Sequence, residues 1–319
     1  MRKTLRKFTL LRNAYKRWLR FYLEMEGRLA VARLSKTQPR QMDASSNLAI
    51  SLTTYGARLG DLHLVLESLL RQDITESYRI AVHLSGADLP GGTVPTEILQ
   101  FEKFGIKFHV HSENVRSYKK LIYEYEDGSD TIVVTADDDV IYPPSWLRRL
   151  YHTHKRHPGA VVAFRAHFLE LGAGNAFLPY KQMMRNSQRD GERTSPRFDL
   201  MPTGVSGILY PPGSLDSVCA DQERFLLLAP SADDIWFKVS SLLRMTPCVQ
   251  VEPRNCYFPF VPGSQGNGAL HEENVTQGRN DQQLAACFDA YPELLKLIAR
   301  PLPNQWPSHS GSDSEHVIR

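Results

Sequence analysis

Five aspartates in two short motifs are the residues of this 319-residue chain whose types and spacing could most directly do chemistry. Three of them, Asp137, Asp138 and Asp139, follow the apolar run 132–134 after Thr135 and Ala136. Three like charges repel one another and raise one another's pKa unless a positive charge lies among them. A divalent cation is the usual remedy, and oxygen ligands favour Mg²⁺ or Mn²⁺ over zinc. A solvated acidic turn that opens the next helix is the simpler alternative.

The second acidic motif lies nearly a hundred residues later, where Asp233 and Asp234 precede the apolar helical stretch 235–243. This position predicts that both carboxylates lie in the first turn of a helix. Ser231 as N-cap with Asp234 three residues on is an approximate capping box, so a purely structural role is one alternative. Because a helix start also fixes where a carboxylate points, the same residues could take a proton from a bound hydroxyl.

The segments around these motifs alternate between strand-like and helix-like patterns. Such alternation predicts an α/β fold with a doubly wound, mostly parallel sheet, in which ligands bind at the carboxyl ends of the strands. The loops 53–58, 85–88 and 137–139 would converge there. Strands are expected over 48–52, 78–84, 106–110, 131–135 and 160–166, and helices over 61–72 (with Asp61 as its cap), 95–104, 119–126 and 144–157.

Charge is distributed unevenly along the chain. Residues 1–40 carry twelve Lys and Arg residues against two Glu, a net charge of +10, whereas the remaining 279 residues hold 26 basic and 33 acidic groups. With 42% hydrophobic and 23% charged residues, the chain is not a disordered, collagen-like or disulfide-stapled protein. We therefore expect a basic helical arm over 1–46, one domain large enough to be an enzyme over 47–300 and a polar tail over 301–319.

The basic arm carries one apolar stripe at helical spacing. An aromatic-rich stripe opposite a Lys/Arg face is typical of a helix that lies on an anionic membrane surface. Packing on the domain and self-association into a homo-oligomer are the alternatives. Nucleic acid is disfavoured because the rest of the chain is acidic and contains no recognised binding motif. The stripe consists of Phe8, Leu11, Tyr15, Trp18, Tyr22, Met25 and Leu29, and roughly opposite lie Arg2, Arg6, Lys16, Arg17 and Arg20.

Cysteine usage and hydropathy indicate the compartment. The four cysteines, at positions 219, 248, 256 and 287, contain no C-x-x-C pair, so a structural zinc site has no support. Four thiols in a chain of this size fit a reducing cytoplasm. No run reaches ~18 apolar residues, and basic residues interrupt the N-terminus where a secretory signal would need an apolar segment. These features predict a cytoplasmic protein, peripheral on the inner face of the cytoplasmic membrane.

Five segments in order carry a resemblance to a known family: ISLTTY (50–55), YKKL (118–121), VTADDDVIYP (134–143), GVSGILYP (204–211) and ADDIW (232–236). Over residues 47 to about 290, the chain resembles bacterial nucleotide-sugar glycosyltransferases of the GT-A fold, near the family 2-like enzymes of capsule and lipopolysaccharide synthesis. The basic arm and the tail lie outside this resemblance.

The resemblance implies roles for individual residues. Asp137–Asp139 would be the D-x-D signature, with Asp139 on a Mn²⁺ or Mg²⁺ ion, Asp137 nearer the nucleotide, and His271 as a further metal contact. Asp234, or less strongly Asp233, stands where inverting enzymes keep their catalytic base. The donor nucleotide would be bordered by Thr53, Thr54, Tyr55, Arg58, Lys119, Lys120, Asp137 and Asp138. Gly204, Ser206, Gly207 and Trp236 would line the loop between donor and acceptor.

The expected activity is metal-dependent transfer of a sugar from a nucleotide-sugar to a glycan or lipid-linked hydroxyl, with inversion, in cell-envelope polysaccharide synthesis. A metal-dependent nucleotidyltransferase or phosphohydrolase would use the same Asp cluster, and a non-catalytic, membrane-associated glycan-binding protein is a further alternative. One more basic stretch, 165–200, could be an acceptor-side loop for an anionic glycan or lipid diphosphate, or a solvated mobile loop. Its basic side chains are Arg165, His167, Lys181, Arg185, Arg189, Arg193 and Arg197.

Overall fold

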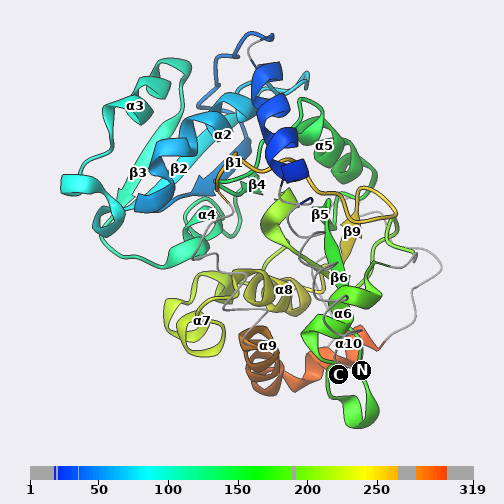
Figure 1. Cartoon of the computed structure of the whole chain (residues 1–319). Coiled ribbons are helices and arrows are strands. Elements are labelled where there is room, and N and C mark those ends of the chain that lie inside the picture. The colour runs from blue at the N-terminus through cyan, green and yellow to red at the C-terminus, as the bar shows by residue number, and fades with distance from the viewer. Residues whose placement is uncertain (1–17, 19–20, 35, 189–191, 265–277, 300–319) are drawn as a thin grey trace, which may run out of the picture.

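The computed structural model of the chain describes residues 18, 21–34, 36–188, 192–264 and 278–299. Its main feature is a seven-stranded sheet with the order β3-β2-β1-β4-β8-β5-β9 (Figure 1). Only β8 runs antiparallel to its neighbours. The mixed α/β fold with a mostly parallel sheet is therefore confirmed. The strands are β1 (Leu48–Thr53), β2 (Arg79–Ser85), β3 (Lys107–His111), β4 (Ile132–Ala136), β5 (Val161–Ala163), β8 (Ile208–Tyr210) and β9 (Cys248–Gln250).

A second, two-stranded sheet pairs β6 (Ala166–Phe168) with β7 (Leu200–Pro202) in antiparallel orientation. The sequence predicted one strand over 160–166, but the chain divides there into β5 and β6. The separation occurs at Phe164, whose carbonyl accepts a hydrogen bond from the Cys256 N–H instead of continuing the ladder with β8. Arg165 therefore lies between two strands, just beyond the carboxyl end of β5.

Helices cover both faces of the main sheet. Neighbouring residues of β4 belong to different cores, since Val134 packs with α2 and α5 and Val133 packs with α4, α7, α8 and α9. This division follows from the alternation of side chains along a strand. The helices are α2 (Leu62–Leu69), α3 (Thr96–Leu99), α4 (Lys119–Ile122), α5 (Trp146–Arg156), α6 (Tyr180–Asn186), α7 (Gln222–Leu228), α8 (Asp233–Leu243), α9 (Arg279–Ala290) and α10 (Leu295–Ile298).

Two predicted helices are shorter than their patterns indicated. Residues 95–104 form α3 followed by a 3-10 turn rather than one α-helix. The helix predicted over 119–126 ends at Ile122, and the next residues serve other contacts. Glu124 pairs with Arg79 of β2 through 2.5 Å and with His83 through 3.1 Å. Tertiary contacts therefore decide where α4 ends.

The N-terminal helix is described over residues 21–34 and lies against the body (Figure 1). Ala30, Val31 and Leu34 pack on the core beside α2 and α5. Gly27 makes the closest approach, because a Cβ at that position would lie 2.4 Å from the Phe260 carbonyl oxygen. The predicted residues Phe8, Leu11 and Tyr15 and the basic residues from Arg2 to Arg17, as well as Arg20, lie outside the described residues, as does the tail 301–319.

Two further expectations concern cysteines and the membrane. All four cysteines are free thiols, and three of them are buried. Over the part of the chain that the structure describes, no helix has both the length and the hydrophobicity needed to cross a bilayer.

Candidate active site

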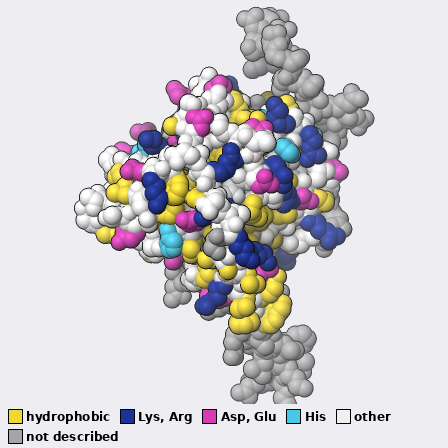
Figure 2. All heavy atoms as spheres, turned by 90° about the horizontal axis from the view of Figure 1, so that it is seen from above, with side chains coloured by type: hydrophobic (Ala, Val, Ile, Leu, Met, Phe, Trp, Pro, Cys, Tyr) yellow, Lys and Arg dark blue, Asp and Glu magenta, His cyan; other side chains and the backbone are white. Residues whose placement is uncertain are grey.

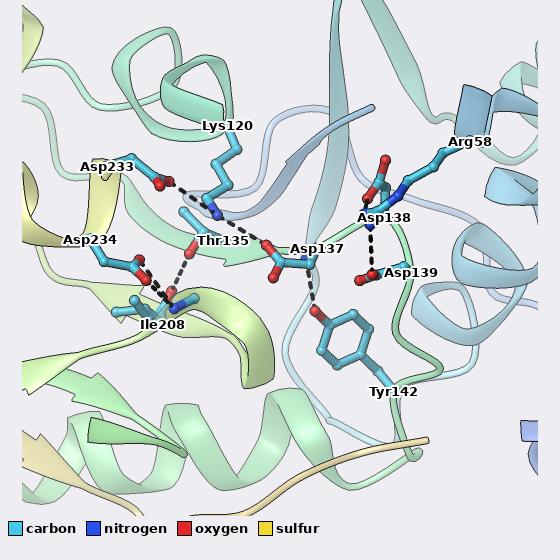
Figure 3. A network of polar contacts seen from close by, with 11 residues as sticks. Arg58, Lys120, Thr135, Asp137, Asp138, Asp139, Tyr142, Ile208, Asp233 and Asp234 are labelled. Atoms are coloured by element: carbon cyan, nitrogen blue, oxygen red, sulfur yellow. Dashed lines mark hydrogen bonds and ion pairs between the residues drawn. The ribbon is translucent and has the colours of Figure 1, made fainter. Parts of the chain in front are cut away.

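The acidic motifs converge at one edge of the main sheet. β1, β4 and β5 end at this edge, and β8, which runs the other way, begins there. Asp137–Asp139 follow β4, the segment Gly204–Ser206 precedes β8, and α8 begins at Asp233 beside them. Figure 3 shows these elements carrying their polar side chains into one network. Residues from distant parts of the sequence are thus brought together where the alternating pattern predicted a ligand site.

Arg58 neutralises two of the three consecutive aspartates. Its guanidinium donates to Asp138 across 2.6 Å and lies 3.1 Å from Asp139. Thr54 donates a further 2.6 Å hydrogen bond to Asp138. Burial by itself would lower the pKa of Arg58, but the charges of Asp138 and Asp139 outweigh it and raise the pKa. The positive charge that the sequence required among these acids is supplied here by a side chain from the loop after β1.

Asp138 is the most confined of the three carboxylates. Burial raises its pKa, and Arg58 and Thr54 oppose that rise. Both of its oxygens accept hydrogen bonds from these two partners. Asp138 therefore orients the β1 loop, which leaves Asp137 and Asp139 as the acids better placed to face a ligand.

Lys120 joins the two acidic motifs. Its ammonium lies 3.0 Å from Asp137 and 3.3 Å from Asp233, so one cation touches both the β4 loop and the start of α8 (Figure 3). Burial alone would lower the pKa of Lys120, yet the neighbouring aspartates hold it well above its ordinary value. Lys120 is consequently a fixed positive charge between the motifs. Sequence reasoning placed it at the donor phosphates but did not foresee this bridge.

Asp234 occupies a different environment at the same edge. The Gly204 N–H lies 3.0 and 3.1 Å from its two carboxylate oxygens. Part of Asp234 remains accessible, but the packed surroundings desolvate its carboxylate. Burial first, and then the charge of Asp233, raise the pKa of Asp234 to about 7, against the opposing effects of Lys120 and the Gly204 N–H. A carboxylate with a pKa near neutrality is suited to accept a proton and release it.

The capping interpretation of the second motif is wrong. The residue that precedes α8 is Ala232, not Ser231, and among the described residues α8 has no side-chain capping hydrogen bond at its N-cap. Ser231 instead contacts Gln283 of α9 through its backbone N–H and its hydroxyl. Because Asp234 accepts from Gly204 rather than from its own helix, its geometry is set by the segment before β8. Asp234 thus has no capping role that would explain it.

Glycines allow the close approach around these acids. A Cβ on Gly204 would lie 3.0 Å from the Lys120 ammonium and 3.3 Å from an Asp234 oxygen. Gly207 has a φ of +90°, and a Cβ there would meet the Trp146 ring at 2.5 Å. The Trp146 indole donates to the Ser206 carbonyl across 2.9 Å. Trp146 thereby fixes the 204–207 segment against the loop that carries the aspartates.

Tyr142 supports the Asp137–Asp139 loop through a hydrogen bond and through ring packing. Its hydroxyl accepts a 2.8 Å hydrogen bond from the Asp137 N–H, and its ring packs 4.3 Å from that of Trp146. Both rings are fully buried. The YPPSW sequence after the aspartates therefore forms the rigid aromatic wall behind them.

Two further residues that the sequence predicted at the donor nucleotide are Tyr55 and Lys119. Tyr55 is exposed at the rim, under the Arg58 guanidinium at 5.5 Å. Lys119 points to the other side of α4, where it donates to Asn114 across 2.7 Å and lies 4.0 Å from Asp88. The structure therefore separates the two adjacent lysines, and only Lys120 reaches the acids.

Three predicted residues do not reach the site, and one cannot be placed. The Thr53 hydroxyl bonds the His83 carbonyl, and the Ser206 hydroxyl bonds the Cys256 carbonyl. Trp236 is buried in the core with its indole on the Cys219 carbonyl at 3.1 Å, so it cannot line a loop that contacts a ligand. His271 lies outside the described residues.

Whether these acids fit a metal ion can be tested on their chemistry. Carboxylate oxygens are the ligands that Mn²⁺ and Mg²⁺ prefer. Over the described residues, however, no group of three or more His, Cys, Asp or Glu side chains could hold a metal ion by itself. Asp137 and Asp139 therefore fit an ion only if a bound ligand, such as a diphosphate, supplies the other oxygens.

Sequence reasoning missed two residues that contact Arg165. Thr203 adjoins Gly204, and its hydroxyl accepts a 2.8 Å hydrogen bond from Arg165. Tyr257 lies under the same guanidinium at 5.3 Å. Adjacency to the glycine motif could have indicated Thr203. Tyr257 lies in an irregular segment without a pattern, so no signal in the sequence marks it.

No family model matches the sequence, and no curated protein resembles it in sequence. Among solved structures, the chain is similar to S. aureus TarS, residues 1–349, with 13% identity and a TM-score of 0.42 over 64% of this chain and 56% of that one. The complex of the same fragment with UDP gives 13% identity and a TM-score of 0.39, over 61% and 55% of the two chains.

A third similar structure is the mannosyltransferase PcManGT from Pyrobaculum calidifontis in complex with GDP-Man and Mn²⁺. It has 12% identity and a TM-score of 0.41, over 88% of this chain and 82% of that one. The match spans little more than half the length of the two TarS chains. Likenesses this distant carry no argument about function.

Proposed function

We propose that this protein is a glycosyltransferase that moves a sugar from a nucleotide-sugar donor to an acceptor hydroxyl. The observation that carries the proposal is the bridge formed by Lys120. One buried cation links an aspartate of the β4 loop to the start of α8, where an accessible carboxylate has a pKa of about 7. A site that can stabilise the negative charge of a leaving group and a carboxylate that can accept a proton thus lie together at one sheet edge.

The donor side consists of the β1 loop, the β4 loop and α4. Breaking a sugar–phosphate bond leaves negative charge on a diphosphate, and a fixed ammonium and guanidinium stabilise such charge. Lys120 and Arg58 are the cations available there. Asp137 and Asp139 would hold a Mn²⁺ or Mg²⁺ ion together with the diphosphate, and when bound the ion would act as a Lewis acid on the leaving group.

The acceptor side centres on Asp234. An acceptor hydroxyl has a high pKa and needs a base within ~2.6–3.2 Å to take its proton. The Gly204 N–H fixes the Asp234 carboxylate, and the raised pKa matches it to this task near neutral pH. Asp233 is occupied by Lys120, so we assign the base to Asp234. Attack opposite the departing diphosphate would invert the anomeric centre.

A nucleotide-sugar panel tests this function. UDP- and GDP-sugars would be incubated with the protein and Mn²⁺, with and without sugar acceptors, and nucleoside diphosphate release would be measured. Glycosyl transfer predicts release that depends on an acceptor, and NMR of the product should show an inverted anomeric centre. Release without any acceptor would favour the alternative of a phosphohydrolase, and release of sugar 1-phosphate would favour a nucleotidyltransferase. If no nucleotide bound or turned over, the non-catalytic glycan-binding alternative would be favoured.

We further propose that the N-terminal helix places this activity at an anionic membrane, on the inner face of the cytoplasmic membrane, in synthesis of cell-envelope polysaccharide. The helix packs on the body through Ala30, Val31 and Leu34, which leaves its predicted stripe outward. Exposed fractions on the outward side run from 41% to 66%, at Trp18, Phe21, Tyr22, Met25 and Leu29. Figure 2 shows hydrophobic side chains gathered at the lower edge of the view, with Lys and Arg side chains next to them.

Charge complementarity favours an anionic membrane as the occupant of this face, because the first 40 residues carry a net charge of +10. The test is cosedimentation with phosphatidylglycerol vesicles. Replacing Trp18, Tyr22 and Met25 together by Ser should weaken binding at least tenfold, whereas Leu227→Ser, at a still more exposed position of α7, should not. Equal binding by the triple variant would contradict the proposal, as would a dimer that the triple variant dissociates. Deleting residues 1–40 is less suitable, since Arg40 donates to the Gln72 carbonyl of the body.

A further inference from the structure

Arg165 is a cation at the active edge whose role the proposed donor and base do not use. It follows β5, two strands away from β4 across β8. It is partly accessible, and over the described residues it forms no ion pair with an acid. Its guanidinium is held by neutral groups, namely the Thr203 hydroxyl at 2.8 Å, the Tyr257 hydroxyl at 3.3 Å and a His167 ring nitrogen at 3.3 Å.

The neutrality of these partners follows from their environment. Because arginine only donates, the His167 nitrogen that faces it accepts and carries no proton. Burial, and then the charges of Arg165 and Arg193, lower the pKa of His167 to about 3, so the imidazole stays uncharged. The Tyr257 ring stacks under the guanidinium at 5.3 Å while more than half of this residue stays exposed. The positive charge of Arg165 is therefore fixed in place and left uncompensated by these contacts.

Other arginines of the basic stretch 165–200 are committed differently. Arg197 pairs with Asp199 through two hydrogen bonds of 2.6 and 2.7 Å. Arg193 is buried and donates to the Ala166 and Ser187 carbonyls. Arg189 lies outside the described residues. The solvated-loop interpretation of the stretch therefore does not hold for Arg193 and Arg197, which stabilise the fold, whereas Arg165 contacts the residue that precedes Gly204.

Arg165 is coupled to Asp234 through a short path. Its hydrogen bond to Thr203 lies one residue before Gly204, which in turn donates to Asp234. The charges of Asp234 and Arg165 both affect the pKa of the buried Tyr180 hydroxyl. Burial is the largest cause that raises this pKa; Asp234 raises it further and Arg165 lowers it. A ligand with a hydroxyl at Asp234 and an anionic group at Arg165 would satisfy both residues.

We propose that Arg165, supported by Thr203 and Tyr257, forms a subsite for an anionic group, a phosphate or a carboxylate, on the acceptor. This inference rests on the proposed function, because it assigns the acceptor class of the same site. Guanidinium–oxyanion contacts are charge-assisted and can be bidentate, so they select an anionic acceptor over a neutral one. Arg165 is here a specificity-determining residue, distinct from the base.

Glucose, glucuronate and glucose 6-phosphate serve as neutral, carboxylate and phosphate probes. Their binding would be measured by calorimetry with the donor site filled by saturating UDP or GDP and Mn²⁺. The wild-type protein should bind at least one anionic probe about tenfold more tightly than glucose. Arg165→Gln should abolish that preference and Arg165→Lys should retain part of it. Arg185→Gln, the same charge change on an exposed arginine of α6, is the matched control and should have no effect.

The outcomes separate the two proposals. If the anionic probes bound no better than glucose, or if Arg165→Gln left the preference intact while its thermal unfolding matched the wild type, the subsite would be rejected. Arg165-dependent anion binding without acceptor-dependent nucleoside diphosphate release would instead reject glycosyl transfer and keep the subsite. The stronger of the two anionic probes identifies phosphate or carboxylate as the preferred group.

Discussion

The two acidic motifs share one sheet edge but differ in the charged partners of their carboxylates. Asp138 and Asp139 are paired with Arg58, and Asp137 is paired with Lys120. Within the described part of the chain, Asp234 has a backbone N–H as its one close hydrogen-bonding partner, and its pKa is raised to about 7. Each carboxylate of the β4 motif thus has a cationic partner, whereas the α8 motif contains a carboxylate suited to exchange a proton.

This difference indicates how one edge could serve two purposes. Charges that must bind a diphosphate or a cation need to be permanent, whereas a base needs a pKa near the working pH. Lys120 sets the boundary, since it touches Asp137 on one side and Asp233 on the other. A change at one motif can therefore be judged with the other motif as the reference.

Asp234→Asn should have the largest effect on activity. Loss of a general base typically costs about 10²–10⁴-fold in rate, so transfer should fall by that factor. Because Asn keeps the size of the side chain and can still accept from Gly204, folding should survive. Acceptor-dependent release of nucleoside diphosphate measures the loss, and a variant that kept more than a tenth of the wild-type rate would contradict the assignment.

The same substitution should make the protein more stable at alkaline pH. A carboxylate whose pKa rises from 3.8 to about 7 on folding binds more protons in the folded state, so wild-type stability falls as pH increases between these values. Asp234→Asn removes that penalty, about 1–2 kcal/mol at pH 8 after allowance for its partial exposure. Thermal unfolding should show a gain at pH 8 that shrinks toward pH 5. A gain of equal size at both values would exclude this cause.

Arg58→Gln, on the donor side of the site, should lower the free energy of unfolding of the protein. The substitution leaves two largely buried carboxylates without their cation, which typically costs about 3 kcal/mol when a buried ion pair is broken. Urea unfolding should show that loss, and Arg58→Lys should recover part of it because the charge remains. A ligand-free protein unaffected by Arg58→Gln would show that another cation neutralises these acids.

The pH dependence of transfer separates the motifs without a substitution. Because Asp234 must be deprotonated to act, kcat/KM should fall about tenfold for each pH unit below 7 and level off above it. Nucleoside diphosphate affinity, which depends on the β4 side, should change much less between pH 6 and 8. An acidic limb centred near 4 would mean that an ordinary carboxylate, rather than Asp234, limits the reaction.

Gly204→Ala should produce the smallest of these effects. Its added Cβ would crowd the Lys120 ammonium and the Asp234 carboxylate at 3.0 and 3.3 Å. A displacement of a few tenths of an ångström should lower transfer about tenfold while unfolding changes little. Gly60→Ala is the matched control, since nothing lies within 4 Å of a Cβ there. Equal activities of the two variants would show that the close approach is unimportant.

The architecture was accessible from the sequence because it depends on local patterns. Buried runs such as 132–136 and the alternation with helices indicated a mostly parallel sheet, and the loops after β1 and β4 were correctly expected at one edge. Element ends were less predictable. The end of α4 depends on Glu124 reaching β2, a contact between residues 45 positions apart.

The site was predictable in its acids but not in its cations. Aspartates beside a buried strand are conspicuous, whereas which of two adjacent lysines faces them depends on the orientation of one short helix. Lys119 and Lys120 are adjacent in the sequence but bind different partners in the structure, Asn114 and Asp137. Trp236 illustrates the converse, since its place inside a promising motif did not reveal that it packs in the core.

The most direct test of the central claim compares Asp139→Asn with Asp234→Asn in two assays on the same preparations. One assay measures calorimetric binding of UDP and GDP with Mn²⁺, and the other measures acceptor-dependent sugar transfer. If the β4 motif binds the nucleotide and Asp234 is the base, Asp139→Asn should weaken nucleotide binding at least tenfold. Asp234→Asn should bind nucleotide like the wild type and lose transfer. Equal loss of nucleotide binding in both variants, or transfer that survives in Asp234→Asn, would contradict it.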